Sequence, residues 1–147
     1  MTQIVVSVET EVWQTRSPDP DDDWDAGDTA GRVVGVTAWA ARDWEKGAFR
    51  RYRGSDSWEG DLDVEPGGYV YAVVADYESG STFGRDGGYA SVVDVFTDVE
   101  TADACAQVAE NTKDYTFEFQ GREYYASWIG YFEYLNDLKV WAVRVNG

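Results

Sequence analysis

The chain of 147 residues has no histidine and a single cysteine. Histidine is the side chain that most often transfers protons near neutral pH, so its absence removes the commonest general base and a common metal ligand. Cys105 cannot form an internal disulfide, and a reducing compartment suits it without being required. Of the metals that proteins usually bind, only Ca²⁺ or Mg²⁺ held by oxygen ligands remains an option.

Long apolar runs are also missing. No stretch approaches the roughly 18 apolar residues that a membrane-spanning helix needs. Residues 1–4 lack the basic segment that begins a secretory signal. We therefore expect no membrane partner and a protein that stays in the cytoplasm where it is made.

Acidic residues dominate the charge: 28 Asp and Glu against 12 Lys and Arg give a formal net charge of −16. Such a charge repels nucleic acid and anionic membranes and favours basic partners. Solubility alone, or adaptation to high salt, would also explain it. The many carboxylates offer pairs for acid–base chemistry, but no spacing singles out two of them. We therefore do not expect an enzyme or a cofactor.

The remaining composition, 44% apolar and 16% aromatic, is that of a folded chain, and its length suits one domain over 1–147. Alternation of apolar and polar residues predicts seven strands; in residues 3–13, Ile4, Val6 and Val8 share one face. The other strands are expected at about 32–44, 69–77, 89–96, 115–119, 122–128 and 138–145. Proline and aspartate predict a solvated loop over 16–31, and glycine predicts an irregular segment over 46–68 and a loop over 78–88.

One amphipathic helix is expected between the strands at 89–96 and 115–119. Thr97 and Glu100 have the spacing of a capping box, and Ala102, Cys105 and Ala109 recur at helical intervals up to about residue 111. The small residues predict close packing on a sheet, with Cys105 buried. The fold class is therefore α+β, mainly antiparallel β-sheet with one short helix, in which 1–68 form a strand pair and 69–147 the core.

Two glycine-containing motifs and the helix between them are similar to those of a known group of proteins. The motif ESGSTFG (78–84), a helix opening with DVE and the motif GYFE (130–133) follow one another. Together they resemble a family of small uncharacterised proteins of tailed bacteriophages, over about residues 69–145. The resemblance implies a phage origin and an accessory role, such as blocking host defences, and no activity. Relatives usually carry an acid in the first motif where this chain has Ser81.

Three segments could bind a ligand. The loop 78–88 combines four glycines, hydroxyls, Phe83 and Arg85, which could cradle a phosphate, although any hairpin connection of this length would contain glycine and serine. Residues 42–53 hold five of the twelve cations, interleaved with aromatic rings. These cations could bind the phosphate of a nucleotide while the rings stack on its base. They could instead form salt bridges with acidic loops of this chain or of a neighbouring subunit. The aspartates at 21–25 alternate as in a calcium loop, but Ala26 replaces the turn glycine and Arg32 the closing glutamate, so a solvated loop is favoured.

These observations favour a non-enzymatic phage counter-defence protein that sequesters a small anionic, nucleotide-type signal molecule in the host cytoplasm. Homo-oligomers could share the site. The residues expected to bind the ligand are Arg50, Arg51, Arg53, Phe83, Arg85, Trp128 and Tyr131. The alternative is an acidic mimic of nucleic acid that blocks a basic host defence protein and binds no nucleic acid itself. A small virion protein is a third possibility.

Overall fold

The computed structural model describes residues 1–14, 29–40, 57–81 and 84–147, with backbone alone at 81, 84 and 85. In chain order the elements are β1 (Thr2–Gln14), β2 (Thr29–Ala40), β3 (Ser57–Leu62), β4 (Tyr69–Ser81), β5 (Gly84–Phe96), α2 (Val99–Asn111), β6 (Thr116–Phe119), β7 (Arg122–Tyr125) and β8 (Glu133–Asn146). The predicted α+β class, mainly antiparallel sheet with a short helix, is confirmed. No described helix is long and apolar enough to cross a membrane.

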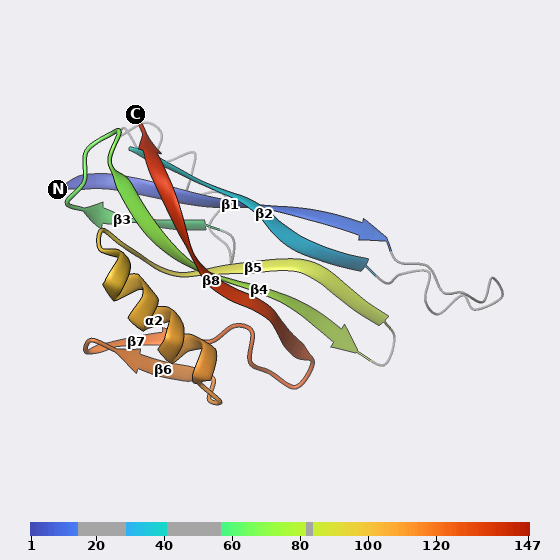
Figure 1. The fold of residues 1–147 in the computed structure, drawn as a ribbon. Coiled ribbons are helices and arrows are strands. Elements are labelled where there is room, and N and C mark those ends of the chain that lie inside the picture. Colours follow the sequence, from blue (N-terminus) through green and yellow to red (C-terminus); the bar gives the residue numbers. More distant parts are fainter. Residues whose placement is uncertain (15–28, 41–56, 82–83) are drawn as a thin grey trace.

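Six strands form one sheet in the order β3-β1-β2-β8-β4-β5. All neighbours are antiparallel except β2 and β8, which pair in parallel at only two positions, Ala38 with Val145 and Trp39 with Asn146. The sheet folds at this short junction, so that β3-β1-β2 packs against β8-β4-β5 (Figure 1). The core between the halves consists of small aliphatic side chains from five strands: Ile4, Val6, Val8, Ala38, Val70, Ala72, Val74, Ala90, Val95, Val143 and Val145.

A third layer covers the other face of β4, β5 and β8. Helix α2 and the β6–β7 hairpin lie there side by side (Figure 1). Ala102, Cys105 and Ala109 are fully buried, as the helical spacing predicted, because small side chains let α2 approach the sheet closely. The cap differs from the prediction: Asp98, not Thr97, begins the helix, since its carboxylate accepts the Thr101 N–H at 3.0 Å.

Several predicted boundaries were wrong. Residues 57–62 form β3, inside the segment predicted to be irregular, because pairing with β1 compensates for a sequence poor in strand formers. Residues 78–88 are mostly strand: β4 continues to Ser81 and β5 begins at Gly84. Strand β8 starts at Glu133 and pairs with this extension of β4. The described residues thus contain eight strands, one more than predicted.

Glycines allow the two long hairpins to touch at the ends of their strands. A side chain on Gly31 of β2 would collide with the backbone of Gly88 of β5, and one on Gly87 would lie 2.8 Å from Ala30 Cα. Thr29 ties the hairpins together, because its hydroxyl donates to Asp86 at 3.2 Å and accepts the Gly87 N–H at 3.3 Å. The aspartate run at 21–25 and the basic segment 42–53 lie outside the described residues.

Candidate functional site

The predicted ligand-binding residues are only partly described. Four of them, Arg50, Arg51, Arg53 and Phe83, lie outside the described residues, as does the side chain of Arg85. Trp128 and Tyr131 are described, and they differ sharply: 3% of Trp128 is exposed against 86% of Tyr131. A site can therefore be built from the described residues only around Trp128.

Residues 78–88 were expected to cradle a phosphate with their backbone amides, but two of the glycine amides in this segment already bind protein acceptors. The Gly80 N–H donates to Phe132 O at 2.6 Å, and the Gly87 N–H donates to the Thr29 hydroxyl. Gly87 and Gly88 are needed where the hairpins touch. Because these two amides already have acceptors, they are not free to bind an anion.

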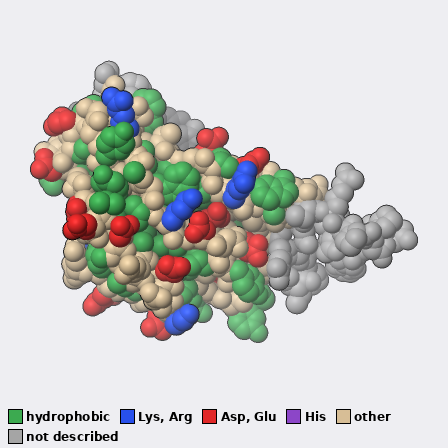
Figure 2. All heavy atoms as spheres, viewed as in Figure 1, with side chains coloured by type: hydrophobic (Ala, Val, Ile, Leu, Met, Phe, Trp, Pro, Cys, Tyr) green, Lys and Arg blue, Asp and Glu red, His purple; other side chains and the backbone are tan. Residues whose placement is uncertain are grey.

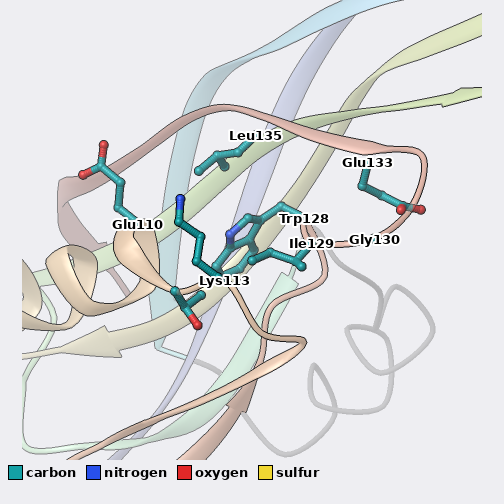
Figure 3. A pocket seen from close by; sticks show the side chains of 8 residues that line it. Glu110, Lys113, Trp128, Ile129, Gly130, Glu133 and Leu135 are labelled. Atoms are coloured by element: carbon teal, nitrogen blue, oxygen red, sulfur yellow. The ribbon is translucent and has the colours of Figure 1, made fainter.

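A cavity of about 300 Å³ opens between the end of α2 and the turn that leads into β8. We call it the Trp128 cavity; it is lined by Glu110, Thr112, Lys113, Trp128, Ile129, Gly130, Glu133 and Leu135 (Figure 3). Its apolar wall comes from Trp128, Ile129 and Leu135, and its charged groups come from α2 and the turn. Tyr131 does not line the cavity. Its ring meets the Phe132 ring edge to face, with 4.8 Å between the ring centroids.

Local backbone geometry holds Trp128 in place. The Ala126 N–H donates to Tyr115 O at 2.8 Å, and the Ile129 N–H donates to Ala126 O at 2.9 Å, which closes a turn around Trp128. The indole packs against Phe117 with 6.2 Å between ring centroids. Trp128 is therefore a rigid wall shared by the core of the third layer and the cavity.

Among the described residues, Lys113 is the only cation that lines the Trp128 cavity. It follows the C-cap residue Thr112, and its side chain runs alongside Trp128 with the ammonium group between Glu110 and Leu135 (Figure 3). Within the described residues it forms no ion pair. Sequence analysis missed Lys113, because a lone lysine after a helix carries no recognisable pattern.

The two carboxylates of the cavity do not neutralise Lys113. Figure 3 shows Glu110 and Glu133 directed outward on opposite sides. Glu133 folds back over its own turn: it accepts the Phe132 N–H at 3.3 Å and occupies the space that a side chain on Gly130 would need. Gly130 therefore helps to keep this carboxylate away from Lys113.

Trp128 offers the cavity a second donor. Its indole N–H has no hydrogen-bond acceptor among the described residues, and in Figure 3 the indole nitrogen lies on the side facing Lys113. Indole N–H groups of buried tryptophans usually find an acceptor. The cavity thus presents two donors without protein acceptors, which suits a ligand with anionic or carbonyl oxygens.

A second cavity, of about 440 Å³, adjoins the first. We call it the Phe117 cavity; it is lined by Gln107, Val108, Asn111, Thr112, Phe117 and Glu118. Thr112 lines both cavities. No lysine or arginine of the described ranges lines the Phe117 cavity.

The outer surface of the third layer is acidic. Helix α2 has no basic residue in its last turn, and Figure 2 shows acidic side chains spread over the visible face with few basic ones. In the hairpin, Glu118 and Glu123 stand directly opposite each other on β6 and β7. Like charges in this position destabilise a sheet, and neither forms an ion pair within the part of the chain described.

A buried polar network fixes the hairpin to β5. Asp94 is 3% exposed and accepts hydrogen bonds from the Tyr124 hydroxyl and from the Val95 N–H at 2.7 Å. Arg122 adds an ion pair at 3.5 Å. Burial, followed by the charge of Asp94, raises the pKa of the Cys105 thiol to about 12, and burial together with the Asp94 hydrogen bond raises the pKa of Tyr124. These groups stabilise the third layer and are poorly suited to act as bases or nucleophiles.

Asp76 is a second carboxylate in an unusual setting. One oxygen accepts the Val33 N–H at 3.0 Å, and the other is buried without a hydrogen-bond partner. Burial raises the pKa of Asp76, and the charge of Asp137 adds to this. The hydrogen bond joins β2 to β4, so Asp76 helps to hold the halves of the sheet together.

No group of three or more metal-ligating side chains occurs among residues with described positions. No protein-family model matches the chain, and neither a curated protein nor a solved structure is significantly similar to it. The resemblance to phage proteins therefore stays a prediction.

Proposed function

We propose that this protein is a non-enzymatic binding protein that sequesters a small anionic, nucleotide-type ligand in the Trp128 cavity. The observation that carries the proposal is the pair of donors without protein acceptors, the Lys113 ammonium and the Trp128 indole N–H. A cavity of about 300 Å³ is at the lower end of the range of small-molecule sites. Trp128 and Leu135 supply an apolar wall against which a ring or sugar can pack.

The biological setting is also a proposal. The resemblance to phage proteins favours a counter-defence role in the host cytoplasm, in which binding alone removes a signal molecule. Such a protein needs affinity and no turnover. It acts in proportion to its amount, so a tight complex matters more than fast exchange.

Isothermal titration calorimetry with a panel of linear and cyclic nucleotides tests this proposal. Lys113→Ala and Trp128→Phe each remove one donor, and we expect each to weaken binding about tenfold or more. Lys139→Ala is the matched control, because Lys139 lies over the Trp141 ring at 4.5 Å and does not line the cavity. No heat with any nucleotide would contradict the proposal, and unchanged binding by Lys113→Ala would contradict the choice of cavity.

A second candidate function is capture of a basic host protein by the acidic third layer. The observation in its favour is the opposed pair Glu118 and Glu123, which costs stability and would be relieved by a cation from a partner. Tyr115 and Tyr125, exposed at the open end of the hairpin, could anchor such an interface.

Affinity capture from host lysate at low and high salt tests the second candidate. A nucleic-acid-binding host enzyme should be retained at low salt and released at high salt. Glu118→Lys should abolish its capture, and Glu59→Lys on β3, outside the third layer, should not. Equal capture by wild-type protein and Glu118→Lys would contradict this candidate.

A further inference from the structure

The two cavities at the end of α2 differ in their charged residues: Glu110, Lys113 and Glu133 line the Trp128 cavity, and Glu118 lines the Phe117 cavity. The Trp128 cavity presents donors, Lys113 and the indole N–H. The Phe117 cavity is lined by Glu118 and by the side-chain amides of Gln107 and Asn111. The two share Thr112 as a lining residue.

The Phe117 cavity offers acceptor oxygens as well as amide donors. The Asn111 amide donates to Gln107 O at 2.8 Å, which leaves the side-chain oxygen of Asn111 available as an acceptor. The Glu118 carboxylate accepts hydrogen bonds only. The last carbonyl groups of α2 also lack helical partners, and they favour positive partial charge nearby. This cavity therefore suits a group with N–H donors.

We infer that the ligand spans both cavities, with an anionic group at Lys113 and Trp128 and a ring that carries an amino group against Glu118 and Asn111. This inference rests on the proposed function and makes it more specific. A nucleotide has the required order of parts: a phosphate at one end and a base with an exocyclic amino group at the other. The ligand class is therefore a nucleotide of adenine, guanine or cytosine.

Phe117 explains why both ends of the site keep their shape. Its ring packs against Trp128 with 6.2 Å between the ring centroids, and it stacks on Tyr124 with 5.2 Å between the centroids. It therefore forms a wall of the second cavity while supporting the wall of the first. A ligand across Thr112 would lie along this aromatic wall, where binding orders few flexible side chains.

Calorimetry with three compounds tests the inference: adenosine 5′-monophosphate, purine riboside 5′-monophosphate, which lacks only the amino group, and ribose 5-phosphate. We expect adenosine monophosphate to bind about tenfold more tightly than purine riboside monophosphate. Glu118→Gln should weaken the binding of adenosine monophosphate about tenfold and leave the binding of purine riboside monophosphate unchanged. Glu123→Gln is the matched control, because it removes the opposing charge but does not line the cavity.

The outcomes separate this inference from the proposed function. Equal affinity for the two nucleotides would overturn the inference, and so would unchanged affinity of Glu118→Gln for adenosine monophosphate. If both nucleotides bind and Lys113→Ala weakens their binding, the proposed function stays intact. Binding of none of the three compounds or of the wider nucleotide panel would overturn both. Circular dichroism of each variant confirms that a loss of affinity does not come from unfolding.

Discussion

Gly31→Ala is the substitution that most directly tests how the two long hairpins meet. The added methyl group would collide with the backbone of Gly88 and lie 3.0 Å from Glu11 O. Backbone cannot rotate away as a side chain can, so the hairpins must separate. Overpacking of this kind costs about 1–3 kcal/mol, and the hydrogen bonds of Thr29 across the contact would weaken as well. We expect the upper end of this range.

Thermal unfolding, followed by tryptophan fluorescence, measures the effect. For a chain of this size, about 3 kcal/mol corresponds to a fall in Tm of roughly 6–12 °C. Gly35→Ala is the control on the same strand, because its methyl group would lie 3.9 Å from Glu9 Oε2, an ordinary contact; it should leave Tm nearly unchanged. A Tm for Gly31→Ala equal to that of Gly35→Ala would refute the close approach of β2 and β5.

Three further substitutions or reagents test the buried polar groups. Tyr124→Phe removes a donor from buried Asp94 and should cost about 1–3 kcal/mol in urea unfolding, whereas Tyr125→Phe, at an exposed position, should cost almost nothing. The raised pKa of Asp76 means that its contribution to stability is present below the ordinary aspartate pKa and is lost as pH rises through the folded-state value. Asp76→Asn should therefore raise Tm near neutral pH and leave it unchanged in strong acid; a lower neutral Tm would contradict this. Cys105, with its pKa raised to about 12, should resist a thiol reagent at mildly alkaline pH until urea unfolds the protein, and rapid reaction of the folded protein would contradict its burial.

The fold class followed from the sequence because its strongest signals are local. Alternation in residues 3–13 predicted a strand and the alanine spacing predicted a helix with a buried face, and both elements are present. In β1 the burial does not alternate throughout, because Val5 is buried as well as Ile4 and Val6. Strand β3 gave no such signal, since Glu59, Gly60 and Asp61 are poor strand formers. Its pairing partner in β1 lies about 50 to 60 residues away, as in the pairs Ser7 with Ser57 and Thr2 with Leu62, and pairing at that distance cannot be seen in a local pattern.

The glycines at 78–88 show how one residue type can suit two different roles. From the sequence, flexible backbone next to hydroxyls indicated an anion site. In the fold, Gly87 and Gly88 allow contact with β2, and the Gly80 N–H binds Phe132 O. Trp128, one of the residues expected to bind the ligand, lines a cavity, whereas Lys113 was not among the predicted residues. Its importance depends on where α2 ends relative to β8, which is a tertiary property.

The charges of the described chain limit where an anion can bind. Among described cationic side chains, Arg32 pairs with Glu11 at 3.4 Å, Arg122 pairs with Asp94, and Lys139 lies over Trp141. Arg144 lines neither the Trp128 nor the Phe117 cavity. Lys113 is the remaining described cation, and it is the one beside an indole donor. If a nucleotide binds and Lys113→Ala does not weaken its binding, the phosphate is held elsewhere, and the predicted Arg50, Arg51, Arg53 and Arg85 are the first cations to test. The same calorimetric experiment, repeated with Arg50→Ala and Arg51→Ala, therefore decides which of the two groups of cations forms the site.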